Sequence, residues 1–497
     1  MTIPLDQSET AAFLRRLAGA EPIETHISLV FVGSDTVWKL KKAVRLSFLD
    51  FTRVADRRHF CERELALNGP VAPGLYRDVV AVVRHPDGSL GLGEACAGTV
   101  LDWVLRMARV PAGDFLDVIA AEGRLDAPLL DEVADSIAAY HQALPPLADI
   151  IPPMREIAAG NVRSALEAGL PADAVRAWDA SMRVALATLG PWLEQRARDG
   201  FVRRTHGDLH LGNMCLWEGR LVPFDALEFD EALATIDLGY DLAFLLMDLE
   251  RVVERAAANR ALNRYVARTG DAAMVRGLPV FLSMRAMVRA HVAARSGRNT
   301  LAKACLAAAG GYLHVAPPIV IAVGGLPGTG KSSLARALAP NLGRAPGALI
   351  VRSDEIRKRQ HGVAPEVPLP QTAYTAAASR TVLETLAETV RCAAEAGQAV
   401  VADATFIDTA HRAMVADAAR QAGVVFVGLW LQAPLAVLEQ RVASRIGDAS
   451  DATVAVLHAA AAHDPGPGDW TPIDATNVDA SVTMALALAR KAIPPHV

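Results

Sequence analysis

The chain has 497 residues and a formal net charge of −5 at pH 7. Hydrophobic residues make up 52% and charged residues 21%, which excludes a globally disordered chain. The near balance of charge gives no generic signature for nucleic acid or for an anionic membrane. Because the chain has no apolar run of about 18 residues and no secretory pattern at its start, we expect neither a transmembrane helix nor a signal peptide.

The cysteines are few and scattered. There are five of them, and no two form a C-x-x-C pair. This excludes a disulfide scaffold and a zinc ribbon and favours a reducing, cytoplasmic location. The thirteen histidines form no Cys/His cluster, so no structural metal site is expected.

The first elements in chain order indicate a small sheet followed by helices. Residues 25–33 and 36–42 read as a two-strand hairpin with a turn at 33–35, residues 52–69 as a helix, and residues 75–85 as one or two strands. From about residue 130 onward, long helical patterns dominate. We therefore expect a small sheet-containing lobe and a larger helical lobe.

A polar loop interrupts the helical region. It begins at His206 and has the pattern H-x-D-x-x-x-x-N, ending at Asn213. An acid and an amide at this spacing can divide two tasks, with Asp208 deprotonating an acceptor hydroxyl and Asn213 holding a metal ion. Residues 214–224 read as a hairpin that delivers Asp225 as a second metal-binding acid. The alternative is a polar turn without chemistry.

The loop HGDLHLGN resembles that of the aminoglycoside-phosphotransferase-like kinases, and the later IDLGYDLAF resembles their D-L-A segment, with Asp241 as its acid. The resemblance covers about residues 25–300 and implies a two-lobed, protein-kinase-like fold. It also implies an upstream lysine that binds nucleotide. We prefer Lys39 in VWKL, with Lys41 left open. The lysine's expected partner on the following helix is Glu64 rather than Glu62, although a surface ion pair is an equal alternative for either acid. Segment 102–107 is a candidate connection between the lobes.

Residues 307–318 combine a glycine pair with a proline pair and give way to the apolar run 319–325. Clustered Gly and Pro punctuate structure, so we place a division near 315. Beyond it, strand, loop and helix alternate, which predicts a parallel sheet with helices on both faces. The predicted α/β multidomain chain thus has two domains: residues 1–314, with an N-lobe of about 20–105 and a helical C-lobe of about 106–305, and residues 315–497.

The strongest motif in the sequence follows the strand at 319–325. It satisfies G-x-x-x-x-G-K-[ST] in full, between an apolar strand and a helix. Its backbone N–H groups and helix N-terminus suit phosphate, Lys331 would reach the β- and γ-phosphates, and Ser332 would hold Mg²⁺. The expected nucleotide-binding residues are Gly325, Leu326, Pro327, Gly328, Thr329, Gly330, Lys331, Ser332 and Ser333.

Two strand ends supply acids to the same domain. Asp403 ends the strand of AVVADAT, where a metal-facing acid is expected, unless it only terminates the strand. Asp354 follows a second strand and is a candidate general base, a role that can coexist with helix capping. Arg441 and Arg445 lie four residues apart on a predicted helix, which suits either a lid over phosphate or a solvated basic face.

These motifs resemble small P-loop kinases of the zeta-toxin, polynucleotide-kinase and gluconate-kinase type over about residues 319–450. The resemblance implies that Asp354 is the general base and that Arg441 and Arg445 belong to the lid. The whole chain looks like the bacterial bifunctional aminoglycoside phosphotransferase/ATP-binding proteins.

The sequence therefore predicts an ATP-dependent kinase that uses Mg²⁺ and ATP in two domains and phosphorylates a hydroxyl of a small molecule. One alternative is a nucleotide-sensing regulator in which one domain is not catalytic. Another is a nucleic-acid 5′-end kinase. Residues 317–497 carry 15 basic and 16 acidic side chains, which counts against a nucleic-acid acceptor.

Overall fold

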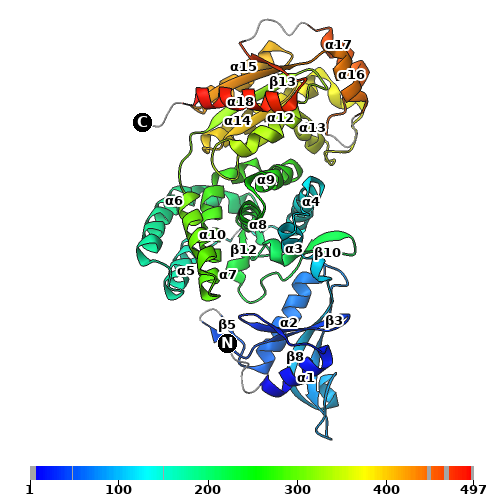
Figure 1. The fold of residues 1–497 in the computed structure, drawn as a ribbon, viewed down its shortest axis with the longest axis vertical. Helices are drawn as coiled ribbons and strands as arrows, with labels where there is room; N and C mark the ends of the chain where they lie inside the picture. Colours follow the sequence, from blue (N-terminus) through cyan, green and yellow to red (C-terminus); the bar gives the residue numbers. More distant parts are fainter. Residues whose placement is uncertain (1–6, 47–48, 149, 445–448, 464–468, 494–497) are drawn as a thin grey trace. The chain divides into compact units, whose positions relative to one another are not determined.

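The structure is a computed structural model that describes residues 7–46, 49–148, 150–444, 449–463 and 469–493 (Figure 1). The chain forms two compact units. The first unit comprises Met1–Asp126, Ala139–Pro153 and Pro191–Leu245; the second comprises Ala127–Ala138, Met154–Gly190 and Leu246–Val497. The predicted division near 315 falls within the second unit, so the domains 1–314 and 315–497 stay a prediction.

The first unit is built on a six-stranded sheet with the order β1-β2-β3-β8-β6-β7 and antiparallel pairing throughout. The predicted hairpin is confirmed, because β2 pairs with β3 across the turn. The strands are β1 (Ile23–Glu24), β2 (Ser28–Val32), β3 (Thr36–Lys41), β6 (Tyr76–Arg84), β7 (Leu90–Gly93) and β8 (Thr99–Ala108).

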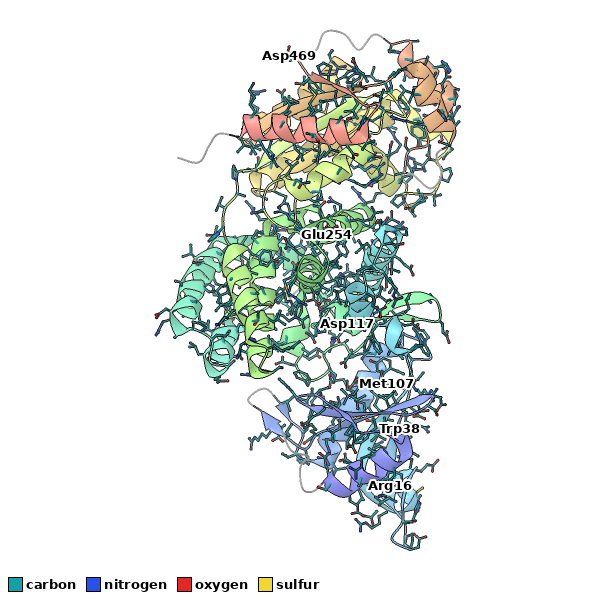
Figure 2. The ribbon with its side chains drawn as sticks, in the orientation of Figure 1. Arg16, Trp38, Met107, Asp117, Glu254 and Asp469 are labelled. Atoms are coloured by element: carbon teal, nitrogen blue, oxygen red, sulfur yellow. The ribbon has the colours of Figure 1, made fainter. Side chains whose placement is uncertain are left out.

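Successive residues of a strand point to opposite faces, and this sheet buries both faces. Val104 of β8 packs with Leu14 of helix α1 (Ser8–Ala18). Its neighbour Leu105 packs on the other face with Cys61 of helix α2 (Val54–Asn68). Figure 2 shows Trp38 and Met107 on the neighbouring strands β3 and β8. The helix predicted over 52–69 is confirmed.

The rest of the first unit carries the polar loop. The hairpin predicted over 214–224 is confirmed, with β10 (Met214–Trp217) paired to β11 (Arg220–Pro223). The other elements are α3 (Leu116–Ala121), β9 (Val202–Arg204), α7 (Glu231–Ala234) and β12 (Thr235–Asp237). Helices α4 (Ala127–Ala143), α6 (Ala172–Arg198) and α8 (Leu238–Val252) belong partly to each unit.

The second unit contains a five-stranded sheet with the order β14-β15-β13-β16-β17 and parallel pairing throughout. The predicted parallel sheet is confirmed. All seven residues of β13 are buried, as expected for the central strand of a sheet covered on both faces. The strands are β13 (Ile319–Gly325), β14 (Leu349–Arg352), β15 (Val400–Asp403), β16 (Val425–Gln432) and β17 (Thr471–Asp474).

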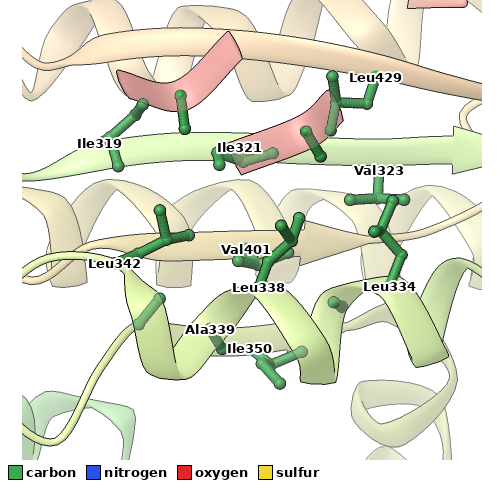
Figure 3. Packing of buried hydrophobic residues seen from close by; sticks show 14 of the residues in the cluster. Ile319, Ile321, Val323, Leu334, Leu338, Ala339, Leu342, Ile350, Val401 and Leu429 are labelled. Atoms are coloured by element: carbon green, nitrogen blue, oxygen red, sulfur yellow. The ribbon is translucent and has the colours of Figure 1, made fainter. Parts of the chain in front are cut away.

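Helices cover both faces of the parallel sheet. Ile321 and Val323 pack with Leu334 and Leu338 of α12 and with Ala485 of α18, and Figure 3 shows part of this cluster. Helices α14 and α15 contact the strands as well. Their bounds are α12 (Lys331–Leu338), α13 (Ser353–Gln360), α14 (Ala376–Glu395), α15 (Thr409–Gln421), α16 (Leu435–Ala443), α17 (Val454–Ala461) and α18 (Val478–Ala492).

The second unit also contains helices that precede the parallel sheet in the chain. These are α5 (Met154–Glu167), α9 (Arg255–Thr269), α10 (Leu278–Arg295) and α11 (Asn299–Gly311). The helical pattern predicted from about residue 130 onward is therefore confirmed. Among the described residues, no helix is both long and apolar enough to cross a membrane.

Candidate functional site

The phosphate-binding motif lies between the central strand β13 and helix α12. Gly325 has a φ of +144° and a Cβ there would lie 2.7 Å from Leu431 O, so glycine is needed where the chain leaves the strand. Lys331 begins α12, and its Nζ donates to the carbonyl oxygens of Gly325 and Leu326 at 3.0 Å. The ammonium group is thus held over the loop that would cradle phosphate.

The loop lies against helix α16. Gly328 has a φ of +86°, and a Cβ there would lie 2.8 Å from Leu438 O. A larger residue would push the loop away from this helix. Arg441, near the end of α16, donates to the carbonyl oxygens of Ala475 at 3.0 Å and Thr476 at 3.4 Å.

Ser332 and Asp403 meet below the loop. Asp403 is the last residue of β15, and its Oδ2 accepts from Ser332 Oγ at 2.6 Å and from Arg352 Nε at 3.2 Å. A hydroxyl and one carboxylate beside the phosphate loop are the protein ligands that Mg²⁺ takes in such sites. The residues present therefore fit a magnesium ion bound together with nucleotide.

A cavity of about 880 Å³ opens over this loop. Asp354 lies in the first turn of α13, two residues after β14 ends, and lines the cavity. Arg352 precedes α13 without a side-chain cap, so the predicted capping role of Asp354 is not seen. The predicted residues that share this wall are Pro327, Gly328, Thr329, Gly330, Lys331, Ser332, Ser333, Asp354, Asp403 and Arg441. Leu326 instead lines a smaller cavity of about 290 Å³, and Arg445 lies outside the described residues.

Sequence reasoning missed a polar group around Asp451, which also lines the cavity. Asp451 accepts from Lys358 Nζ at 2.6 Å, from Tyr374 OH at 2.5 Å and from Leu369 N at 2.9 Å. These contacts hold the pKa of Asp451 below its usual range, although burial opposes them. The guanidinium of Arg357 lies 4.7 Å from the centre of the Tyr374 ring. No local motif in the sequence marks this group, because its members come together only in the fold.

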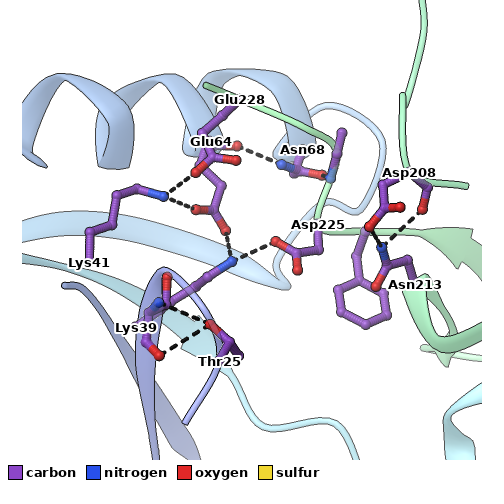
Figure 4. A network of polar contacts seen from close by, with 12 residues as sticks. Thr25, Lys39, Lys41, Glu64, Asn68, Asp208, Asn213, Asp225 and Glu228 are labelled. Carbon is purple, nitrogen blue, oxygen red and sulfur yellow. Dashed lines mark hydrogen bonds and ion pairs between the residues drawn. The ribbon is translucent and has the colours of Figure 1, made fainter. Parts of the chain in front are cut away.

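In the first unit, the lysines of β3 meet the acid predicted on α2 (Figure 4). Lys39 Nζ bonds to Glu64 Oε1 at 2.7 Å and to Asp225 Oδ1 at 2.5 Å. Burial alone would lower the pKa of Lys39, but Asp225 and Glu64 raise it well above its ordinary value. The structure thus brings together Lys39, Glu64 and Asp225, which are far apart in the sequence.

Lys41 forms a second pair behind the first. It bonds to Glu64 Oε2 at 2.8 Å and to Glu228. Burial by itself raises the pKa of Glu64, yet the two ammonium groups bring it down to about 2. Burial raises the pKa of Glu228. The sequence left Lys41 as an alternative to Lys39 and did not point to Glu228. The one hint of Glu228 in the sequence is its position three residues after Asp225.

Asp208 and Asn213 lie at the ends of one short loop. Asn213 Nδ2 donates to the backbone oxygen of Asp208 at 3.0 Å and to its Oδ2 at 3.1 Å. The carboxylate of Asp208 is 42% exposed and can therefore meet an acceptor. Asp225 has a φ of +62°, which is uncommon for a residue other than glycine and is typical of strained functional positions.

Asp241 organises this loop from below. Its buried carboxylate accepts from the backbone N–H groups of His206 at 3.2 Å and Gly207 at 2.9 Å. His141 Nε2 lies 3.2 Å from the same carboxylate. His141 is itself fully buried. Burial lowers the pKa of His206.

One interpretation of the sequence is wrong. Segment 102–107 does not connect the lobes, because it lies inside β8, where β3 and β6 pair with both edges of the strand. In the described part of the chain, no cluster of three or more His, Cys, Asp or Glu residues is able to hold a metal ion.

Comparison with known proteins supports a P-loop domain in the C-terminal part of the chain. Residues 320–465 match the model of a family described as AAA domain. The match spans the whole phosphate-binding loop, and it confirms the P-loop part of the resemblance inferred from sequence.

Relatives extend over most of the chain. Two uncharacterized proteins, one from Mycobacterium tuberculosis and one from Mycobacterium bovis, are each 28% identical over 466 residues, which covers 90% of this chain and 90% of each relative. Among solved structures, a gluconokinase from Sinorhizobium meliloti is 24% identical, with a TM-score of 0.26, and the match covers 36% of this chain and 95% of that one. A choline/ethanolamine kinase family protein from Mesorhizobium loti is 16% identical, with a TM-score of 0.36 and coverage of 61% and 99%.

The chain thus combines a unit built on an antiparallel sheet with a parallel-sheet domain that contains the phosphate-binding loop and matches the AAA domain family. Phosphate-binding loops of this type generally bind a nucleotide together with Mg²⁺.

Proposed function

We propose that this protein is a kinase with two nucleotide sites, which transfers the γ-phosphate of Mg·ATP to a hydroxyl group of small-molecule acceptors. One observation carries the proposal. One cavity of about 880 Å³ is lined by Lys331, by the hydrogen-bonded pair Ser332 and Asp403, and by the carboxylic acid Asp354. These are the parts that phosphoryl transfer requires, since its catalysis is mainly positioning and charge stabilisation.

In the second unit, each group would have a distinct task. Lys331 would bind the β- and γ-phosphates, and Ser332 with Asp403 would hold Mg²⁺, which neutralises charge on the phosphates when bound. Asp354 would accept the proton of the acceptor hydroxyl as its oxygen bonds to the γ-phosphorus and ADP departs. Arg441 would turn from the backbone oxygens it now contacts toward the transferring phosphate.

In the first unit, Lys39, oriented by Glu64, would bind nucleotide phosphate. Asn213 and Asp225 would hold Mg²⁺, and Asp208 would serve as the base. Asp208 and Asn213 are already joined by hydrogen bonds, which supports a preorganised loop.

We propose a small molecule as the acceptor and the cytoplasm as the location. The near-zero charge of residues 317–497 supports the first point, because nucleic-acid binding depends on neutralising phosphates with basic groups. The second rests on the five cysteines, all free in the described residues, which suit a reducing compartment.

The test is transfer of labelled γ-phosphate from Mg·ATP to a panel of polyols, amino alcohols, amino sugars and sugar acids. The panel includes a 5′-hydroxyl oligonucleotide, which tests the nucleic-acid alternative. Lys331→Ala and Asp354→Asn should each lower transfer to one acceptor by about 100-fold or more, and Asp208→Asn should do the same for a second acceptor. Gly310→Ala, in helix α11, is the matched control.

If Asp208→Asn leaves every transfer activity intact, the first unit is not a kinase and the nucleotide-sensing alternative replaces it. If Lys331→Ala leaves transfer intact, the C-terminal assignment is wrong. Labelling of the oligonucleotide with a steep dependence on salt would overturn the small-molecule acceptor.

A further inference from the structure

We propose that helix α9, which comes from the kinase-like part of the chain, is a working element of the P-loop kinase. Its Asn263 is a positioning residue that holds the edge strand β14 and, through it, the carboxylate of Asp354. The inference rests on the proposed function, in which Asp354 is the general base.

Strand β14 lies at the edge of the parallel sheet, so only β15 pairs with it. An edge strand presents a row of backbone N–H and C=O groups that need partners. At the start of β14 these groups belong to Ala348 and Ile350. Both residues are buried, so their backbone groups need hydrogen-bond partners from the protein rather than from water.

Two asparagines of α9 satisfy this edge. Asn263 Oδ1 accepts from Ile350 N at 2.7 Å, and Asn263 Nδ2 donates to Ala348 O at 3.2 Å. One carboxamide therefore pairs with both backbone groups, as a peptide unit of a sixth strand would. Asn259 Nδ2 adds a second bond to Ala348 O at 3.0 Å.

The chain next to the strand is shaped for this contact. Gly347 has a φ of +124°, and a Cβ there would lie 2.8 Å from Asn259 Nδ2. Glycine thus keeps open the close approach of the helix. Asn259 is itself only 2% exposed. Helix α9 begins just after Glu254, which Figure 2 labels.

Strand β14 is closely followed by the residue proposed as the general base, Asp354. Ile350 precedes Asp354 by four residues, and helix α13 begins immediately where β14 ends. Helix α9 also contacts α13, where Arg359 Nη1 donates to Ala267 O at 3.3 Å. A loss of the amide ladder would therefore let β14 and Asp354 shift together, and a displacement of about 1 Å at a catalytic group can cost about 100-fold in rate.

A second contact holds the chain after α13. Glu366 pairs with Arg264 at 2.6 Å and with Arg268 at 3.2 Å, and both arginines also pair with Asp135 of α4. Three residues later, Leu369 lines the cavity. Helix α9 therefore contacts the chain both before α13, at β14, and after α13, at Glu366.

The experiment uses the full chain carrying Asp208→Asn, so that only the C-terminal site turns over. Release of phosphate from Mg·ATP with water as the acceptor gives kcat and the KM for ATP, and hydrogen exchange reports on Ile350 N–H. Asn263→Ala should lower kcat by about 10-fold, leave KM within about twofold and speed exchange at Ile350 by about 10-fold or more. Asn341→Ala, which removes a hydrogen bond from the turn after α12 to Ala337 O, should change none of these.

A double variant separates positioning from a general structural effect. If Asn263 acts through Asp354, Asn263→Ala causes no further loss of kcat in the Asp354→Asn background. An equal loss in both backgrounds, or unchanged kcat and exchange in Asn263→Ala, would overturn the positioning role while the proposed function stands. If Asp354→Asn itself keeps full turnover, the base assignment fails and this inference fails with it.

Discussion

Two lysines of strand β3 share one buried carboxylate in the first unit. Glu64 is fully buried and receives Lys39 on one oxygen and Lys41 on the other. Only Lys39 also reaches Asp225, which the sequence predicts as a metal ligand. We therefore assign the nucleotide to Lys39, and we assign to Lys41 the task of fixing Glu64 and Glu228.

This division of roles predicts that replacing two neighbouring buried lysines by alanine lowers the unfolding free energy by different amounts. Lys41→Ala leaves Glu228, which is 4% exposed, without its cation, so we expect a loss of about 3 kcal/mol of unfolding free energy. Lys42→Ala is the matched control. Its partner Glu24 is 40% exposed and can be hydrated, so the loss should be about 1 kcal/mol. Urea titration of both variants measures the difference, and equal losses would contradict the assignment.

A buried histidine predicts a sensitivity to acid. His291 lies in α10 with no hydrogen-bond partner at Nδ1, and burial, helped by Arg295, lowers its pKa to about 4. A histidine with a depressed pKa contributes stability above its unfolded value of about 6.5 and loses it as the pH falls. The unfolding free energy should therefore drop between pH 6.5 and pH 4, by at most about 3 kcal/mol from this group.

His291→Gln should flatten this pH dependence, and the exposed His59→Gln should leave it unchanged. Denaturant titrations at pH 7 and pH 4.5 measure it. A His291→Gln chain as acid-sensitive as the parent would show that other groups titrate.

Some of these residues could be found from the sequence, and others could not. The phosphate loop and the polar loop are local, because a single turn must hold all of their groups, so spacing alone identifies them. Glu228 and Asp451 are different. Their partners lie far away in the chain, at Lys41 and at Lys358, and only folding brings the charges together.

At the scale of elements, the pattern of apolar residues predicted most of the sheets correctly. The strands over 319–325 and 399–405 read as buried because they lie between layers of helices. Segment 102–107 misled the interpretation, since a central strand also reads as an apolar run and periodicity does not show where a strand leaves the sheet.

One face of the parallel sheet depends on two glycines. Trp470 packs on Gly428 and Gly324, where a Cβ would lie 2.4 Å and 2.8 Å from the indole ring. Gly428→Ala should therefore displace the ring and cost about 2 kcal/mol of unfolding free energy. Gly310 lies inside helix α11 with open space around it, so Gly310→Ala should instead raise the unfolding free energy by about 0.5 kcal/mol. Thermal unfolding of the two variants measures opposite shifts, and a stable Gly428→Ala chain would mean that the ring has room to move.

At the scale of the whole molecule, the order of the elements along the chain does not predict which elements pack together. Helix α9 precedes the predicted domain division near residue 315, yet it packs in the same compact unit as the P-loop sheet. The glycine and proline cluster at 307–318 marks a change of element type, and composition cannot show which earlier helices return to pack on the new sheet.

The central claim is that one chain carries two nucleotide sites. Equilibrium binding of a non-hydrolysable Mg·ATP analogue tests it most directly. We expect about two analogue molecules per chain, about one for Lys331→Ala or Lys39→Ala alone, and none for the double variant. A stoichiometry of one that Lys39→Ala leaves unchanged would contradict the account.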